Sequence, residues 1–332
     1  MNFLEKRKNQ LGIKSLKEML DEGEITKGID ESLFVHGPEE FDLLVTKWSR
    51  QEVLSVIGDS SSGKSEVALC FMKLILKNNP NSGGIYVSLE MTNGKLGQRF
   101  FTMCKDDSTI PERFFPISRY DKDGKSREID MDFIKKEVVK YRDIVGDIVV
   151  IVIDHIHCMG ENDPSTLNSI MIALKEMAVE LNCLVIPLAQ VNKGAGQKGE
   201  VPLDADSVLA SSQLKYISSD IIQIHRPIAR FEEQAGFSVL GFGYCKIREA
   251  HKDDKIKKLQ NKLLVYVSEN RSFRKMTNDE VTIFKEYYEQ LLALKSAEEK
   301  QKAFAYDLTK EIVGANGKTV VLREIFTGTN DD

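Results

Sequence analysis

The stretch Gly58-Asp59-Ser60-Ser61-Ser62-Gly63-Lys64-Ser65 decides how the rest of this chain is interpreted. It matches the phosphate-loop pattern G-x-x-x-x-G-K-[ST] at every specified position. Its glycines let the backbone curl, so that several N–H groups can point at one anion. Lys64 would add positive charge at the outer phosphates, and the Ser65 hydroxyl suits Mg²⁺. The stretch therefore predicts a site for nucleotide phosphates and Mg²⁺.

The flanking residues supply the setting that a phosphate loop requires. Leu54-Ser55-Val56-Ile57 runs into the stretch as a short apolar strand, and residues 65–77 leave it with helical periodicity. A helix that begins at the loop directs the positive end of its dipole at the phosphates. A Ser- and Gly-rich turn with an incidental lysine would not need both neighbours, so we interpret the stretch as a phosphate loop.

Composition sets the broad class of protein. The chain has 332 residues, of which 42% are hydrophobic and 29% charged, which indicates a globular protein of one large α/β domain with appendages or of two domains. Its net charge of −5 argues against a generally basic nucleic-acid coat but leaves room for a local basic channel. We see no membrane-length apolar run and no signal peptide, and the five scattered cysteines favour free thiols in a reducing cytoplasm.

Strand and helix patterns alternate from about residue 40 to residue 245. Helical patterns occupy residues 65–77, 94–104, 131–143 and 166–181. The expected strands are apolar and rich in β-branched residues, as in parallel strands covered on both faces: Val53–Ile57, Gly84–Leu89, Ile148–Ile153, Cys183–Leu188, Ile221–His225 and Val239–Lys246. The alternation predicts an α/β fold with a doubly wound, mainly parallel sheet and helices on both faces. Ligands of such sheets bind at the carboxyl ends of the strands, where we expect every chemical residue named below.

We divide the chain into three parts. Residues 1–30 have an approximate helical rhythm and predict a short N-terminal helix that packs either on its own core or on a neighbouring subunit. Residues 31–277 hold the α/β domain. Residues 278–332 form a helical C-terminal extension, in which Thr277-x-x-Glu280 indicates a capping box that opens a helix to about residue 295. A second helix is expected at 297–313, followed by a frayed tail.

Three polar side chains that follow apolar strands are candidate site residues, one for the metal and two for catalysis. Asp154 ends the strand at 148–153, where a carboxylate can hold Mg²⁺ through water. Glu90 follows the strand at 84–89 and could polarise a water for attack on a γ-phosphate. Gln190 lies just past the strand at 183–188, and its neutral amide could sense that phosphate. The spacing alone is equally consistent with a solvated carboxylate at Glu90. It is also consistent with an incidental polar residue at Gln190.

Two further pairs of residues have a spacing of two. Lys246 and Arg248 lie on one face of a strand, either as a solvated pair or as a pair that reaches a neighbouring subunit's nucleotide as an arginine finger. His155 and His157 have a spacing that permits metal binding, but no third ligand is evident in the sequence.

As a set, these motifs resemble the C-terminal motor domain of DnaB-type replicative helicases, which are RecA-like ATPases. The order and rough spacing of that family are kept over about residues 30–275. Ser88-Leu89-Glu90-Met91 is the most specific element, and residues 174–182 and 219–226 are also similar. The other matching segments are the phosphate loop, Ile153-Asp154-His155-Ile156, Leu188-Ala189-Gln190-Val191-Asn192-Lys193 and Lys246-Ile247-Arg248.

The resemblance implies a DNA helicase that hydrolyses ATP with Mg²⁺ and moves 5′ to 3′ on single-stranded DNA in replication. It implies a ring, usually a hexamer, in the cytoplasm of a bacterium or of a phage-infected host, with a primase or a loader protein as partner. Lys64 and Ser65 would hold phosphate and Mg²⁺, and Asp154 would support the metal.

The remaining roles also follow from the resemblance alone. Glu90 would be the base for the attacking water, and Gln190 would couple the γ-phosphate to the DNA-facing loops. Lys246 and Arg248 would act on the ATP of the adjacent subunit.

The sequence also departs from that family. The family's N-terminal collar domain is missing, and residues 1–30 resemble instead the family's linker helix, which grips the next subunit. Residues 278–332 have no counterpart in the family. The first channel loop, residues 160–165, carries two acids and no base, and the second, residues 193–200, offers two lysines and several glycines. Phosphate binding needs cations or N–H donors. Two other functions therefore stay open, a filament-forming RecA-like strand-exchange protein and a KaiC-like regulatory or scaffold ATPase.

Overall fold

The computed structural model describes residues 48–120, 123–160, 163–190, 212–247 and 262–294, together with the short strands β1 (Ser32–Leu33), β12 (Ile312–Val313) and β13 (Thr319–Val320). The short helix expected in residues 1–30, the second channel loop and Arg248 lie outside the described residues. β1 pairs antiparallel with β2 (Trp48–Ser49).

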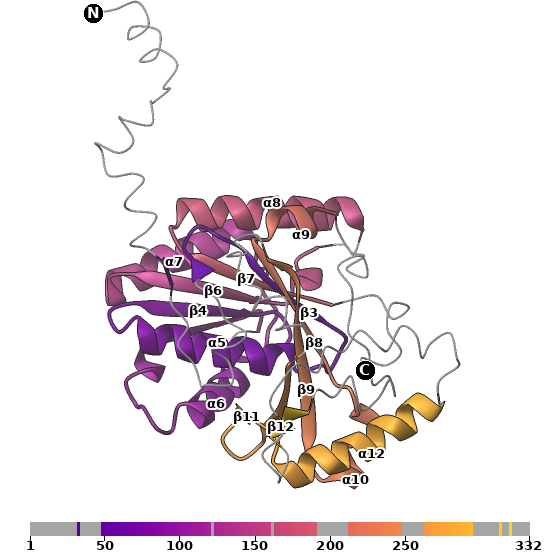
Figure 1. Cartoon of the computed structure of the whole chain (residues 1–332). Helices are drawn as coiled ribbons and strands as arrows, with labels where there is room; N and C mark the ends of the chain where they lie inside the picture. Colours follow the sequence, from indigo (N-terminus) through magenta and orange to yellow (C-terminus); the bar gives the residue numbers. More distant parts are fainter. Residues whose placement is uncertain are drawn as a thin grey trace, which may run out of the picture.

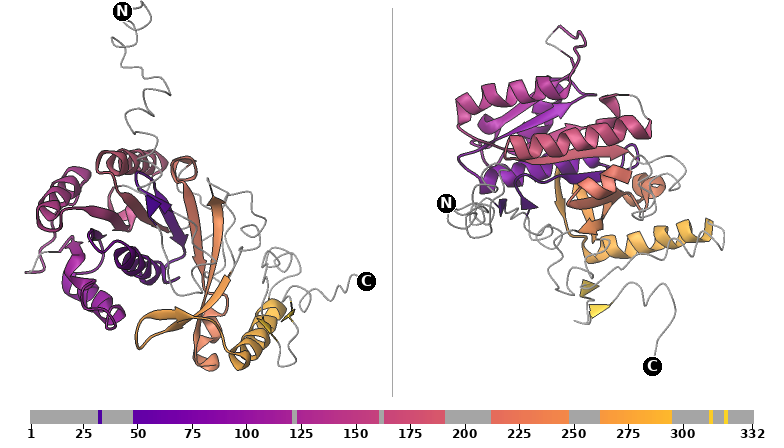
Figure 2. Two further views of the ribbon diagram at one scale, coloured as in Figure 1. Left: turned by 60° about the vertical axis from the view of Figure 1, so that its left-hand side comes forward. Right: turned by 90° about the horizontal axis from the view of Figure 1, so that it is seen from above.

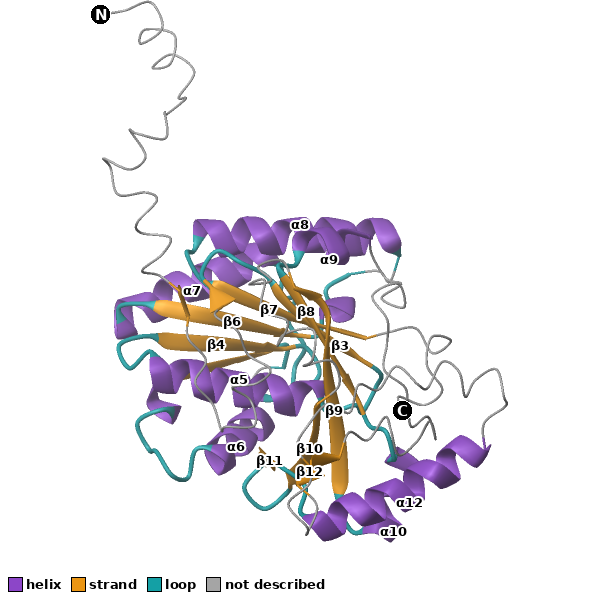
Figure 3. Ribbon diagram, in the orientation of Figure 1, coloured by secondary structure: helices purple, strands orange, loops and turns teal. Residues whose placement is uncertain are grey.

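A nine-stranded sheet runs through the middle of the molecule (Figures 1 and 3). Its order is β11-β10-β9-β8-β3-β7-β6-β4-β5. The six strands β5, β4, β6, β7, β3 and β8 are all parallel to one another. Beyond β8, each of the strands β9, β10 and β11 runs antiparallel to the strand before it. The bounds are Leu54–Gly58 (β3), Gly83–Ser88 (β4), Phe114–Ser118 (β5), Ile148–Asp154 (β6), Leu184–Gln190 (β7), Asp220–His225 (β8), Ser238–Ile247 (β9), Lys262–Val267 (β10) and Ser272–Arg274 (β11). This confirms the expected α/β fold with a mainly parallel sheet.

The direction of β9 corrects one expectation. The strand expected at Val239–Lys246 exists but runs antiparallel to β8. The connection between them holds only a 3₁₀ turn at Ala229–Phe231 and the four-residue helix α10 (Glu232–Ala235). A parallel pair needs a crossover that carries the chain back along the sheet. This connection has no helix long enough to do so.

Helices cover both faces of the sheet, as Figures 1 and 2 show. The helices α5 (Lys64–Asn78) and α6 (Asn93–Met103) pack on one face. On the other face lie α7 (Met131–Val145), α8 (Pro164–Glu180) and α9 (Ser212–Ile217). Successive side chains of a strand point to opposite faces. Val56 accordingly joins the core under α5, whereas Ile57 joins the core under α7 and α8.

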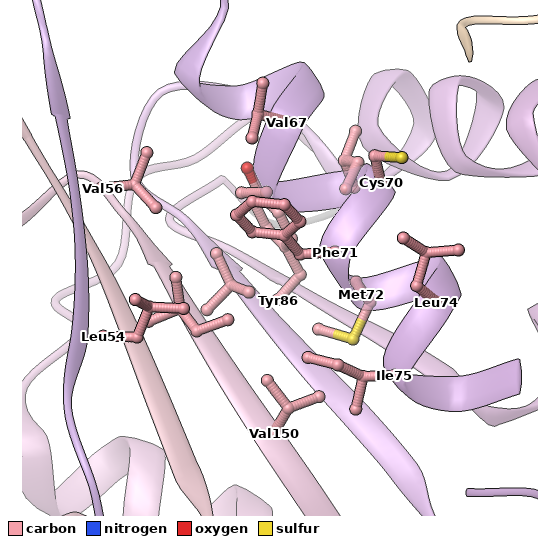
Figure 4. Packing of buried hydrophobic residues seen from close by; sticks show 14 of the residues in the cluster. Leu54, Val56, Val67, Cys70, Phe71, Met72, Leu74, Ile75, Tyr86 and Val150 are labelled. Carbon is pink, nitrogen blue, oxygen red and sulfur yellow. The ribbon is translucent and has the colours of Figure 1, made fainter. Parts of the chain in front are cut away.

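The core under α5 fixes the two elements that flank the phosphate loop (Figure 4). Val56 of β3 and Phe71 and Ile75 of α5 are fully buried. The Trp48 ring meets the Phe71 ring edge-on, with centroids 5.0 Å apart. Burying one such aromatic or aliphatic side chain contributes about 1.5–3 kcal/mol. The two ends of the phosphate loop are therefore fixed, because β3 and α5 pack in the same core.

A third, smaller core lies beyond the antiparallel strands. There α12 (Asn278–Leu294) and α10 pack against β9 and β10 through Val239, Phe284 and Leu291. The helix expected at 297–313 does not extend to its predicted end, because Ile312–Val313 pairs with Thr319–Val320 as a small antiparallel ladder. Both pieces are rich in β-branched residues, which favour strands. Among the described helices, none has the length and apolar character needed to cross a lipid bilayer.

Candidate nucleotide-binding site

The phosphate loop joins the end of β3 to the start of α5, and both of its glycines are required by shape. Gly63 caps α5 with φ 96°, a left-handed conformation that side chains disfavour. A Cβ at Gly63 would lie 2.7 Å from Leu240 Cδ2. A Cβ at Gly58 would lie 2.5 Å from the Ile224 carbonyl oxygen. A side chain at Gly58 would push the loop away from the backbone of β8, and one at Gly63 would strain the left-handed backbone there.

Lys64 curls back over the loop. Its Nζ donates to the carbonyl oxygens of Gly58, at 2.9 Å, and Asp59, at 2.6 Å. Burial lowers the pKa of Lys64 to about 8, against the opposing effect of the nearby Asp154 carboxylate. The ammonium group is therefore still mostly charged at neutral pH. It is held at the loop by carbonyls that a phosphate oxygen can replace.

Asp154 lies at the end of β6, buried beside the loop. Its carboxylate accepts hydrogen bonds from the Tyr86 phenol, at 2.8 Å, and from the Ser65 hydroxyl. Burial raises the pKa of Asp154, and these two hydrogen bonds partly offset that rise. A hydroxyl and a carboxylate side by side are the hard oxygen donors that Mg²⁺ prefers. The donor set of Ser65 and Asp154 therefore fits the expected metal.

Tyr86 is a site residue that the sequence did not reveal. It lies inside an apolar strand and is fully buried, so the pattern around it indicates only a core position. Burial and the adjacent Asp154 carboxylate raise its pKa well above the ordinary value of a phenol. Tyr86 therefore stays protonated and can act only as a donor toward Asp154.

Glu90, His155 and Gln190 meet at the same edge of the sheet. The register pairs Ser88 with Asp154 and Gly58 with Gln190, which brings the ends of β4, β6, β3 and β7 together. His155 Nε2 lies 2.9 Å from Glu90 Oε1 and 3.0 Å from Gln190 Nε2. The Glu90 side chain is 56% exposed and that of His155 only 8%. The candidate base thus faces solvent while its partner is enclosed.

Among the residues that the structure describes, one group of potential metal ligands lies in this corner. Glu90, His155 and Cys158 offer an oxygen, a nitrogen and a sulfur within 4.8 Å of one another. The Cys158 sulfur, however, lies 3.7 Å from Nδ1 and 3.8 Å from Nε2 of the ring. At nearly equal distances it is off the axis of either lone pair. It does not converge with Glu90 on one point in front of Nε2, as a bound ion would require.

His157 does not join these groups as a ligand. Its ring centroid lies 5.7 Å from that of His155, and its Nε2 lies 3.1 Å from the Gln190 carbonyl oxygen. The pair His155 and His157 therefore does not form the two-histidine site that its spacing would permit.

A charged cluster braces the start of α5, and sequence reasoning missed it. Glu66, the residue after Ser65, forms ion pairs with Arg99 of α6, at 3.1 Å, and with Arg271 in the turn between β10 and β11. The Tyr266 hydroxyl also lies 3.3 Å from Glu66. These partners come from distant segments, so only the folded chain brings them together. The cluster ties the antiparallel strands to the loop helix.

Lys246 is not brought to this site within its own chain. It pairs with Ile221, near the start of β8, whereas Gly58 pairs with Ile224 farther along that strand. Its Nζ donates to the Ser218 carbonyl oxygen, at 2.7 Å, and to that of Lys215. The expectation that all chemical residues share the carboxyl edge of the parallel strands is therefore wrong for Lys246. Because β9 is antiparallel, its carboxyl end lies toward the opposite edge.

The fold of this chain is similar to those of solved ATPase and helicase structures. A structure of an ATPase domain matches with a TM-score of 0.60 at 17% identity, covering 80% of this chain and 99% of that one. A structure of a DnaB-like replicative helicase and its interactions with primase matches with a TM-score of 0.58 at 15% identity, covering 82% of this chain and 71% of that one. No family model matches the sequence, and no curated protein matches it. The chain therefore shares the fold of these ATPase and helicase structures, which is the expected RecA-like α/β fold.

Proposed function

We propose that this chain is the motor of a DnaB-type helicase, which hydrolyses ATP between the subunits of a ring and moves along single-stranded DNA. One observation carries the proposal. The phosphate loop, Asp154, Glu90 and Gln190 converge on one edge of a RecA-like sheet, although they come from four different strand ends.

Each of these residues has a distinct task in hydrolysis. The N–H groups of the loop and the Lys64 ammonium bind the phosphates. Ser65 and Asp154 would hold Mg²⁺, which supplies charge neutralisation on the phosphate oxygens. Glu90 accepts a proton from the attacking water, and Gln190 donates from its amide to the terminal phosphate. Because the Glu90 carboxylate is exposed, water reaches it without any rearrangement of the core.

The position of Lys246 supports a shared site. It lies away from its own loop, so Lys246 can serve a nucleotide only if that nucleotide is bound by a neighbouring copy. A ring or filament of like subunits supplies such a neighbour.

A regulatory or scaffold ATPase is the second candidate, and one observation favours it. Residues 160–165, where the first DNA-facing loop is expected, contain Glu161 and Asp163 but no lysine or arginine. Negative charge there weakens the attraction of the channel for phosphates. A motor and a scaffold differ in whether DNA accelerates ATP turnover.

The proposal is tested by ATP turnover of the purified chain with Mg²⁺, with and without single-stranded DNA, and by unwinding of a forked duplex. We expect Lys64→Ala to lower turnover by about 10²-fold or more, the scale seen when one charge-stabilising donor is removed from a site. Lys77→Ala, at the exposed end of the same helix, is the matched control and should turn over ATP as the wild type does.

Three results separate the alternatives. Stimulation by DNA together with unwinding supports the motor. Turnover that does not respond to DNA identifies the scaffold. Normal turnover in Lys64→Ala would show that the catalytic site lies elsewhere.

A further inference from the structure

We propose that His155 is a positioning residue that links the occupancy of the terminal-phosphate site to the placement of Glu90. This inference rests on the proposed function, because it concerns how that site prepares its base. It starts from one ring nitrogen with two neighbours. His155 Nε2 lies 2.9 Å from Glu90 Oε1 and 3.0 Å from Gln190 Nε2.

The two neighbours of Nε2 need opposite hydrogen-bonding roles from it. An ionised carboxylate only accepts hydrogen bonds, and the amide nitrogen of glutamine only donates them. A neutral imidazole nitrogen carries either a hydrogen or a lone pair. Nε2 can therefore donate to Glu90 or accept from Gln190, but it cannot do both. Because the His155 side chain is only 8% exposed, solvent does not readily replace the partner that is lost.

The surrounding backbone is fixed, so the choice falls to the side chains. The Leu89 N–H donates to the Asp154 carbonyl at 2.8 Å, which ties the segments that carry Glu90 and His155. Gln190 is paired with Gly58 in the parallel ladder, and its carbonyl lies 3.1 Å from His157 Nε2. A change of partner at Nε2 thus needs only rotation of an amide and a carboxylate.

Two arrangements follow. Without a terminal phosphate, the Gln190 amide donates to Nε2, the ring proton lies on Nδ1 near the Cys158 sulfur, and Glu90 is released. With the phosphate bound, the amide turns to it, and Nε2 carries the proton and donates to Glu90 Oε1. That bond leaves Glu90 Oε2 to accept the proton of the attacking water. The two arrangements differ in which ring nitrogen of His155 carries the proton.

The test begins with three variants of a wild-type chain that hydrolyses ATP. His155→Phe keeps a ring of similar size and removes both ring nitrogens. We expect kcat to fall by about 10²-fold, as for a poorly placed general base, with little change in KM for ATP. His155→Gln keeps one N–H donor for Glu90 and should recover part of the loss. Tyr216→Phe alters an exposed aromatic ring on α9, outside the site, and is the control.

A double variant tests the link itself. If Gln190 affects Glu90 through His155, kcat of the double variant His155→Phe with Gln190→Ala is no lower than that of the slower single variant. Effects that multiply would show two independent residues and overturn the proposal.

A spectroscopic readout is independent of turnover. The protein is labelled with ¹⁵N-histidine, and the line of His155 is assigned by its loss in His155→Phe. We expect the ring proton on Nδ1 with ADP and on Nε2 with a non-hydrolysable ATP analogue. Gln190→Ala should abolish this difference.

The outcomes distinguish a failure of the His155 link from a failure of the proposed function. If the wild type hydrolyses ATP and His155→Phe is as fast, the link is wrong and the proposed function is unaffected. The link is also wrong if kcat of His155→Phe falls only together with nucleotide affinity and thermal stability. The same holds if the tautomer is identical with both nucleotides. If the wild type hydrolyses no ATP, the proposed function falls and takes this inference with it.

Discussion

Tyr86 places a neutral donor on the carboxylate that we expect to support the metal. The Tyr86 hydroxyl is 2.8 Å from Asp154 Oδ2 and its side chain is fully buried. An outer donor of this kind fixes the rotamer of a metal-binding carboxylate and leaves its other oxygen available. Asp154 is also bonded by Ser65, so the two potential metal ligands orient each other.

Tyr86→Phe should therefore weaken the metal site without disturbing the core, because the ring is kept. We expect affinity for Mn²⁺ in the presence of ADP to fall by about 10- to 100-fold. Electron paramagnetic resonance of free Mn²⁺ measures this without turnover. Tyr266→Phe removes a hydroxyl that lies near Glu66 and should leave the affinity unchanged. Equal affinities in wild type and Tyr86→Phe would refute the role of the hydroxyl.

His225 carries a pH dependence of a different kind. Its ring is buried in β8, against Gly241, where a Cβ would lie 2.1 Å from the ring. Burial lowers the pKa of His225 from 6.5 to about 3. Between pH 6.5 and about pH 3, His225 is protonated in the unfolded chain but not in the folded chain. Folding stability should therefore fall as pH drops from 6.5 toward 3, by up to about tenfold in the unfolding constant per pH unit.

Urea unfolding at pH 7 and pH 5 checks this expectation against His225→Leu, which carries no titrating ring at that position. The wild type should lose more stability between the two pH values than the variant does. An identical loss in both proteins would mean that His225 does not contribute.

At the scale of elements, α12 begins where the sequence predicted. The Thr277 N–H donates to Glu280 Oε2 at 2.8 Å, and the Glu280 N–H lies 3.3 Å from Thr277 Oγ1. These are the two reciprocal bonds of a capping box. Arg274, at the end of β11, adds a two-pronged ion pair to Glu280 at 2.6 and 2.7 Å. The pair lowers the pKa of Glu280 to about 2, so the carboxylate stays ionised at any ordinary pH.

Glu280→Ala should remove both the cap and the ion pair. We expect a loss of about 1–2 kcal/mol in the unfolding free energy, the range for a lost cap. Faster amide hydrogen exchange in the first turn of α12 would show that the loss is local. Glu286→Ala, in the middle of the same helix, is the control. A Glu280→Ala protein with the urea midpoint of the wild type would contradict this interpretation.

Other elements were less accessible from sequence. β5 (Phe114–Ser118) was not predicted, because Pro116 interrupts its apolar pattern. The strand lies at the edge of the sheet and pairs only with β4, where a missing N–H is tolerated. The direction of β9 was also missed. A period-2 pattern reports which faces are buried but not which way the strand runs.

At the scale of the whole molecule, the antiparallel strands separate Lys246 from the loop of its own chain. A catalytic role for Lys246 at the loop therefore needs a second copy, and the proposed shared site assigns Arg248 to the same neighbour. Arg248→Ala alone should bind ATP but hydrolyse it about 10³-fold more slowly or worse, as for a lost arginine finger. Glu90→Ala alone should also be slow.

Mixing the two variants should restore turnover, because some interfaces then pair an intact Glu90 with an intact Arg248. Steady-state ATPase across mixing ratios measures this, and each variant mixed with wild type is the control. Failure of every ratio to exceed the sum of the separate rates would count against a shared site.

What the sequence determined by itself was local. The phosphate loop, the capping box at Thr277 and Glu280, and the alternation of strands with helices are relations between residues a few positions apart, and the chain's own geometry enforces them. The strand ends that carry Asp154, Glu90 and Gln190 followed from the same patterns.

Only the tertiary structure decided which atoms meet. Tyr86 and Asp154 are 68 positions apart, and Glu90 and His155 are 65 apart. Their contacts depend on which strands become neighbours and in what register, and hence on packing across the whole sheet. The same packing turned β9 antiparallel and moved Lys246 to the other edge. That is why the residue types of the site could be predicted from the motifs, whereas the bond at His155 and the position of Lys246 could not.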